Sequence, residues 1–100
     1  MKRYEWHGHE IQVSCQIVGQ PLPSLFALRR GFVVTTGGRH FYPDPAKGLP
    51  MRTRFEIRDG AEVHQGEVLS AHPTFLLPRM SYQLIIDGEV IAADAQWLNL

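Results

Sequence analysis

His7 and His9 have the spacing that comes closest to a metal-binding motif in this chain of 100 residues. Side chains at positions i and i+2 of one strand point to the same side, so two such imidazoles can chelate zinc or copper. Gly8 between them indicates a turn, however, and a turn would separate the rings. No spacing determines which of the other three histidines would supply a third ligand. A metal-binding or small enzyme-like domain using His7 and His9 is therefore an alternative interpretation.

The single cysteine, Cys15, follows Val13 on an apolar stretch that alternates like a strand. We expect a buried small hydrophobic group and not a nucleophile, because no spacing brings a histidine to it as a base. The chain has no G-x-S-x-G motif and no glycine-rich phosphate loop before a helix. Its aspartates mostly stand at turn positions, where turn chemistry explains them. The sequence thus predicts a protein that is not an enzyme, with no catalytic residue, cofactor or metal.

Charge is balanced over the whole chain, with ten basic and ten acidic residues, but it is not balanced along it. Residues 29–58 carry seven basic and two acidic side chains, whereas residues 59–100 carry one basic and six acidic. We expect the two regions to neutralise each other across a sheet, the alternative being a polar surface for a protein partner. Zero net charge argues against nucleic acid as a partner. A second alternative is still single-stranded nucleic-acid binding through four arginines, Arg29, Arg30, Arg52 and Arg54.

An apolar cluster beside two prolines is the candidate partner surface. It consists of Leu22, Leu25, Phe26 and Leu28, and the basic pair Arg29 and Arg30 follows it. If the cluster is buried, which we favour, it caps the core. If it is exposed, it forms a surface for a protein partner or for a homodimer.

Turn signals separate short stretches of alternating apolar and polar residues throughout the chain. The alternation is clearest at residues 4–13 and 51–57, a β-branched run stands at 33–36, and no long stretch has a helical period. These patterns predict one all-β domain over residues 1–100, with about eight short antiparallel strands joined by hairpins. We expect a β-sandwich, and a partly open barrel is the alternative.

Two hairpins are predicted from the pairing of apolar side chains. The first, over residues 4–13, has a two-residue turn and one apolar face. The second has a three-residue loop at residues 58–60 in the form of a G1 bulge, because this loop pairs Phe55 with Val63.

The hairpin over residues 81–92 has the strongest turn signal, Asp87-Gly88 between two apolar runs. In a regular two-residue hairpin, apolar residues meet on both faces. We therefore expect this hairpin to be buried on both sides at the centre of the fold, so that Ile85→Lys would unfold the domain. Beyond it, Trp97 either packs back on the core or belongs to a fraying tail.

The features that bear on location are few. A lone cysteine fits a reducing compartment. The N-terminal residues show no apolar run typical of a signal peptide, and no stretch approaches the length of about 18 apolar residues that a membrane helix requires. We expect a soluble cytoplasmic protein of bacterial style that does not contact membranes.

Two motifs suggest a family. The stretch Arg-Thr-Arg-Phe-Glu-Ile-Arg-Asp-Gly at 52–60, followed by Ser-Tyr-Gln-Leu-Ile-Ile-Asp-Gly-Glu-Val-Ile at 81–91, resembles the β-sandwich of Fas apoptotic inhibitory molecule-like proteins and small bacterial relatives. The chain departs from that pattern at 20–28 and at 35–38. The resemblance implies a sandwich fold and a protein-interaction role, and it transfers no catalytic residue. The leading hypothesis is thus a non-catalytic protein-interaction or binding module.

Overall fold

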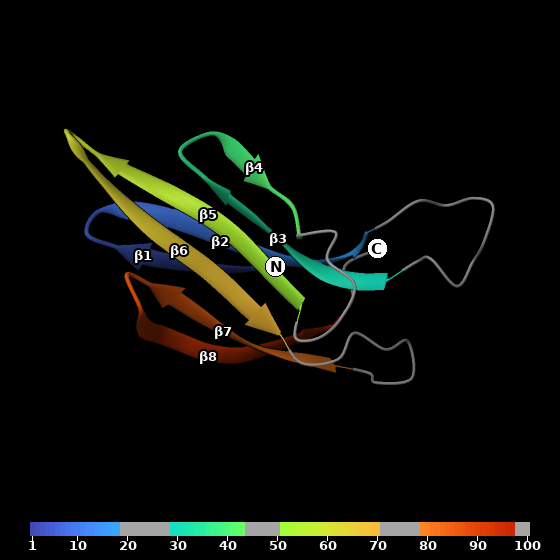
Figure 1. Ribbon diagram of the computed structural model, residues 1–100. Helices are drawn as coiled ribbons and strands as arrows, with labels where there is room; N and C mark the ends of the chain where they lie inside the picture. Colours follow the sequence, from blue (N-terminus) through green and yellow to red (C-terminus); the bar gives the residue numbers. More distant parts are fainter. Residues whose placement is uncertain (19–28, 44–50, 71–78, 98–100) are drawn as a thin grey trace.

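The computed structural model describes residues 1–18, 29–43, 51–70 and 79–97, and the regular structure within them is entirely β-strand. Figure 1 shows the strands in two layers. They are β1 (Lys2–Trp6), β2 (His9–Val18), β3 (Arg29–Thr36), β4 (Arg39–Phe41), β5 (Met51–Asp59), β6 (Glu62–Ser70), β7 (Arg79–Ile86) and β8 (Glu89–Trp97). Within these ranges no helix is long and apolar enough to cross a membrane.

Each layer is a four-stranded antiparallel sheet in sequence order, β1-β2-β3-β4 and β5-β6-β7-β8. The sheets stack so that β4 lies near β5 at one side of the molecule and β1 lies near β8 at the other. The prediction of an all-β antiparallel sandwich of eight strands is confirmed. The alternative, a partly open barrel, is wrong because the described strands form two separate sheets.

Alternate residues of both sheets form one core between the layers. It comprises Ile11, Val13, Cys15, Phe32 and Val34 from the first sheet, and Phe55, Ile57, Val68, Met80, Tyr82, Leu84 and Ile86 from the second. Burial of each large apolar side chain contributes on the order of 1.5–3 kcal/mol to folding. Cys15 is fully buried, as predicted for a small hydrophobic group.

Two of the hairpin turns have the predicted form. At His7-Gly8 and at Asp87-Gly88 both residues have positive φ, 48° and 81° in the first turn and 52° and 79° in the second. A type I′ turn requires this conformation, which matches the twist of the flanking strands. In the first hairpin Trp6 lies opposite His9, and the two-residue turn predicted there is confirmed.

The hairpin of β5 and β6 differs from the prediction. Its loop consists of residues 60 and 61, not the predicted three residues, and Phe55 lies opposite Gly66, not Val63. The reason is steric, because the Phe55 ring occupies the space that a side chain at position 66 would need. Gly66 thereby fixes the register, since only glycine permits this close approach within a strand.

The hairpin of β7 and β8 differs from the prediction in burial and position. Side chains of β7 alternate between buried and exposed, so this hairpin has one dry face and not two. β8 is an edge strand and not a central one. Trp97 belongs to β8 and is 64% exposed, so it neither packs on the core nor lies in a tail beyond the sheet. The pairing differs as well, because a β-bulge at Ile91 moves the partner of Leu84 from Ile91 to Ala92.

Candidate functional site

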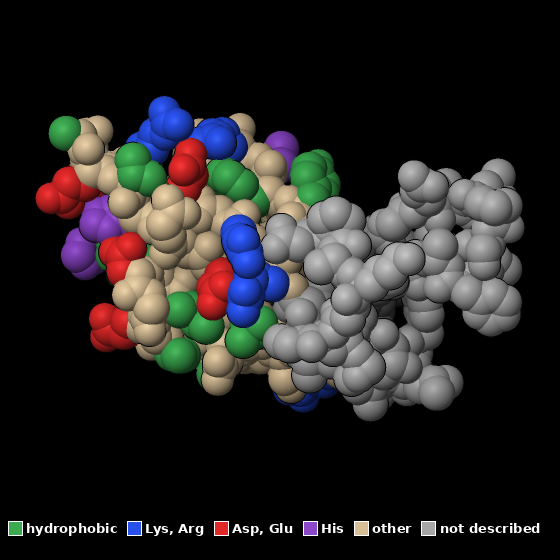
Figure 2. All heavy atoms as spheres, in the orientation of Figure 1, with side chains coloured by type: hydrophobic (Ala, Val, Ile, Leu, Met, Phe, Trp, Pro, Cys, Tyr) green, Lys and Arg blue, Asp and Glu red, His purple; other side chains and the backbone are tan. Residues whose placement is uncertain are grey.

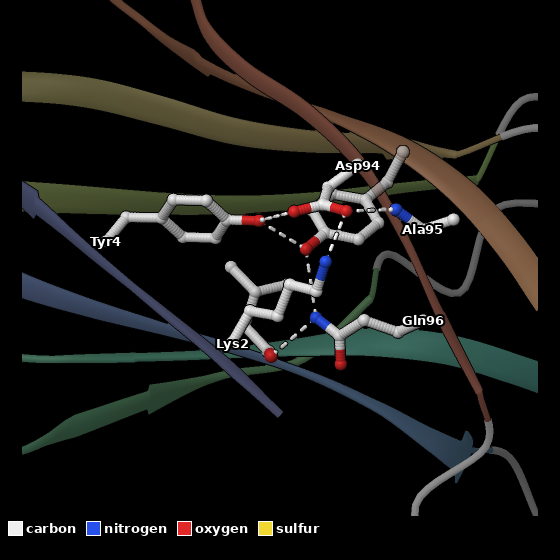
Figure 3. Close-up of polar contacts among 7 residues, drawn as sticks. Lys2, Tyr4, Asp94, Ala95 and Gln96 are labelled. Carbon is white, nitrogen blue, oxygen red and sulfur yellow. Dashed lines mark hydrogen bonds and ion pairs between the residues drawn. The ribbon is translucent and has the colours of Figure 1, made fainter.

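A polar network joins the two sheets where β1 meets β8 (Figure 3). At its centre the Asp94 carboxylate forms an ion pair with the Lys2 ammonium group. The same carboxylate accepts a hydrogen bond of 3.2 Å from the Tyr4 hydroxyl and one of 2.8 Å from the backbone N–H of Ala95. Asp94 is thus held by a residue of its own strand and by two residues of the opposite sheet.

The network continues inward through two buried side chains. The amide nitrogen of Gln96 donates to the backbone carbonyl of Val13 at 2.8 Å and to the Tyr82 hydroxyl at 3.0 Å. The hydroxyl oxygens of Tyr82 and Tyr4 lie 2.5 Å apart. Because Gln96 donates to Tyr82 and Asp94 can only accept, the protons are ordered in one direction, from Gln96 through the two tyrosines to Asp94.

The ionisation of this network is fixed near neutral pH. The hydrogen bond from Lys2 holds the pKa of Asp94 below its usual value, with help from the N–H of Ala95. Burial raises the pKa of the Tyr4 hydroxyl far above its usual value, as does its hydrogen bond with Tyr82. Asp94 is therefore a carboxylate, and Tyr4 is a neutral hydroxyl that donates to it.

The inward position of Asp94 leaves the outer face of β8 without charge between Glu89 and Trp97. The side chains on this face, which we call the outer row, are Val90, Ala93, Ala95 and Trp97. Val90 is 51% exposed and Trp97 is 64% exposed. A shallow groove on this side of the sheet is lined by Leu69 and the two alanines together with polar residues of β7, among them Arg79. Figure 2 shows hydrophobic side chains together over β7 and β8, whereas charged side chains of both signs lie over β5 and β6.

The other edge strands carry charge or are very short. β1 presents Arg3 and Glu5 to solvent, and β4 has three residues. β5 has charged side chains on its outer face, namely Arg52, Arg54, Glu56 and Arg58. Charges and short length are the usual protection of an edge strand against pairing with another chain. β8 has a bulge at Ile91 and an inward-pointing charge at Asp94, but the outer face of residues 92–97 carries no charged side chain.

Only part of the predicted partner surface lies within the described residues. Leu22, Leu25, Phe26 and Leu28 lie outside the described residues. Arg29 and Arg30 are the first two residues of β3, where their backbones pair with Val18 and Ile17. The outer row of β8 was not among the predicted site residues, although the alternation Ala-Asp-Ala-Gln-Trp at 93–97 could have indicated a strand with one small, apolar face.

The four arginines of the nucleic-acid alternative stand on two different sheets. Arg29 and Arg30 belong to β3, and Arg52 and Arg54 belong to β5 of the second sheet. The Arg52 guanidinium lies 2.9 Å from a carboxylate oxygen of Glu67, so its charge is already paired. Among the described side chains of these arginines, Arg52 is therefore not available as an unpaired contact to a phosphate backbone.

The two histidines of the metal alternative have separate partners. The His7 ring stacks on Trp6 with ring centroids 4.0 Å apart, whereas His9 lies 3.6 Å from the carboxylate of Asp59. Since His7 stands in the turn itself, the two rings do not share one side of a strand. Among the described residues no three histidine, cysteine or acidic side chains form a group that could hold a metal ion.

A polar pair that the sequence did not predict lies at the end of the sandwich where three hairpin turns meet. His64 of β6 lies 2.6 Å from the Asp87 carboxylate, and that carboxylate also accepts the backbone N–H of Gln65 at 3.1 Å. Trp6 contacts His64 edge-on at 4.8 Å. The Asp87 carboxylate raises the pKa of His64, and His64 in turn lowers the pKa of Asp87. This pair ties the last hairpin to β6.

Comparisons with protein-family models, curated proteins and solved structures gave no match to this chain. The likeness to Fas apoptotic inhibitory molecule-like proteins therefore stays a prediction.

Proposed function

We propose that this protein is a non-catalytic protein-interaction module whose binding surface is the edge of β8, the long edge strand with an uncharged outer face. The observation that supports the proposal is the outer row, four uncharged side chains on an edge strand that ends in an exposed tryptophan. An edge strand offers unpaired backbone N–H and C=O groups to an extended segment of a partner. Side chains at alternate positions then provide specificity, and a solvent-exposed tryptophan is a frequent source of binding energy.

The rigidity of β8 favours such binding. Asp94 and Gln96 fix the strand to the first sheet through Lys2, Tyr4 and Val13. A strand that is already held in an extended conformation loses little conformational entropy when a partner strand pairs with it. The polar network thus serves as support for the binding edge in this proposal. The proposal also includes a cytoplasmic location, which the single buried cysteine favours.

The test compares two alanine-to-lysine variants in affinity capture from the native lysate. Ala95→Lys places a charge on the edge, while Ala61→Lys places the same charge in the exposed turn between β5 and β6. We expect the wild type and Ala61→Lys to capture the same protein, and Ala95→Lys to lose it. Capture that is equal for all three proteins, or no specific capture at all, would contradict the proposal.

A further inference from the structure

We propose that the turn end of the sandwich, where the β1–β2, β5–β6 and β7–β8 turns meet, is a pH-sensitive contact between the two sheets. The contact closes when His64 and His9 carry a proton, and it loosens when both are neutral. Figure 2 shows histidine and acidic side chains together at this end, on the left of the view. The inference goes beyond the proposed function and does not rest on it.

Both ring nitrogens of His64 face a carboxylate. Nδ1 lies 2.6 Å from Oδ2 of Asp87 in the β7–β8 turn, and Nε2 lies 3.4 Å from Oε2 of Glu62 at the start of β6. A neutral imidazole has one N–H and can donate to only one of these oxygens, whereas the protonated ring can donate to both. The positions of the two carboxylates therefore favour the charged form of His64.

The charge on His64 acts across the two sheets through Trp6. This indole belongs to β1 of the first sheet, and its centroid lies 4.8 Å from the centroid of the His64 ring. Because the π system of an indole attracts a cation, protonation of His64 strengthens the contact between the sheets. His7 stacks on the same indole at 4.0 Å, so Trp6 also connects the β1–β2 turn to this contact.

A second imidazole joins the sheets directly. His9 of β2 lies 3.6 Å from the Asp59 carboxylate of β5, and this is an ion pair only when His9 is protonated. Arg39 and Arg58 line the same cleft and oppose a positive charge on His9. Both arginines donate to the Glu56 carboxylate, at 3.0 and 3.3 Å, so their charges are compensated locally. His64 is therefore the principal group of the contact, and His9 adds to it.

The sign of the pH dependence follows from the neighbours of His64. Its hydrogen bond with Asp87 raises the pKa of His64, against the opposing effect of burial, and the negative charges of Asp87, Glu62 and Asp59 raise it further. The stabilisation is therefore complete below the unfolded pKa and is lost as pH rises through the folded value. The pKa of Asp87 is lowered, chiefly by its hydrogen bond with His64, so Asp87 stays a carboxylate throughout this range.

The first experiment measures amide hydrogen exchange of the full chain at about pH 5.5 and about pH 8, expressed as protection factors. We expect protection at residues 4–11 and 64–66 to fall by about threefold at the higher pH, the size typical of a partly exposed ion pair. Residues 68–70, at the other end of β6, should change less. Protection that does not fall at the turn end, or that falls equally along β6, overturns the proposal.

Two substitutions remove the charges without removing the turn. Asp87→Asn keeps a residue that tolerates the positive φ of 52° before Gly88, and His64→Gln keeps a polar side chain that cannot titrate. Both variants should lose most of the pH dependence. His40→Gln is the matched control, since His40 is exposed on β4 and contacts Thr35. Circular dichroism verifies that each variant is folded, and a wild-type pH dependence in His64→Gln contradicts the proposal.

An NMR titration of the wild type requires no substitution. The indole N–H resonance of Trp6 should shift with the midpoint of the His64 ring, and the nuclear Overhauser effect between the two rings should weaken above that midpoint. Trp97 is the internal control, because its indole is exposed at the other end of β8 and should not follow His64. A Trp6 resonance that does not follow His64, or an Overhauser effect of constant strength, would overturn the coupling between the sheets.

Discussion

The two edges of the second sheet, β5 and β8, each belong to an antiparallel hairpin but show opposite surfaces. β5 turns arginines and a glutamate outward, and these pair with residues of β4, β5 and β6. β8 contains an acidic residue in its middle as well, yet Asp94 faces inward and leaves alanine and tryptophan outside. The direction in which charged residues point, and not their number alone, thus decides whether the outer face of an edge strand is charged or uncharged.

The largest effect should come from charging the inner face of β7. Leu84 is completely buried, and Leu84→Lys should destabilise the fold by more than about 4 kcal/mol, enough to unfold it. Ile85 lies on the outer face opposite Val90, so Ile85→Lys should cost less than about 1 kcal/mol. Urea unfolding followed by circular dichroism measures both. If Ile85→Lys unfolds the protein, both faces of the β7–β8 hairpin are buried, and the outer face of β8 does not differ from β5 in the way described.

The next largest loss of stability should come from a change that disturbs the register of β5 with β6, which keeps the arginines of β5 on the outer face. Gly66→Ala places a methyl group against the Phe55 ring and should cost about 1–3 kcal/mol. A register slip by one residue would turn the charged face of β5 toward the core, so the strand cannot avoid the clash in that way. Phe55→Leu makes room, and the double variant should lose less stability than the two single changes added together. Strict additivity would show that this contact does not set the register.

A smaller loss should follow when the support behind β8 is weakened. Tyr82→Phe removes a buried hydroxyl that joins Gln96 to Tyr4, and it should cost about 1–2 kcal/mol. Tyr42→Phe is the matched control, since Tyr42 is exposed and its change should leave stability the same. Hydrogen exchange should become faster at the amides of β8 in Tyr82→Phe. Unchanged exchange in β8 would mean that the network does not stiffen the edge.

The smallest effect is a pH dependence at the turn end. The folded pKa of His64 is raised, so its contribution to stability is complete below the unfolded pKa and is lost as pH rises through the folded value. The folded pKa of Asp87 is lowered, so its contribution disappears as pH falls through that lower value. The pair should therefore stabilise the fold most at mildly acidic pH. Thermal unfolding of His64→Gln between about pH 5 and pH 8 should show a flatter profile than the wild type, and parallel profiles would refute the coupling.

Local patterns in the sequence were sufficient for the fold class and for the two-residue turns at His7-Gly8 and Asp87-Gly88. They failed where distant parts of the chain decide the outcome. Leu84 can pair with Ile91 or with Ala92 in equally apolar surroundings, and the local sequence does not distinguish the two. Asp94 is held by Lys2 and Tyr4, which stand about ninety positions away from it in the chain. Gly66 did carry a local signal, since a glycine within a strand indicates a close approach.

The candidate site was harder to predict for a related reason. An edge strand is recognised only when the order of strands is known, and strand order depends on contacts between sheets. Ala93, Ala95 and Trp97 are ordinary residues in the sequence. They become a surface only because β8 has a neighbour on one side alone.

The bulge at Ile91 has a consequence for how this surface could arise or disappear. β8 contains one residue more than the segment of β7 with which it pairs, and this additional residue, Ile91, has no partner in β7. In the regular register the same amino acids would present Asp94 and Gln96 to solvent and point Trp97 at the core. One additional residue thus determines whether the outer face of β8 is charged or uncharged, without any substitution on either face. Deletion of Ile91 would remove the bulge, and in the regular pairing that results the same residues of β8 would still point outward.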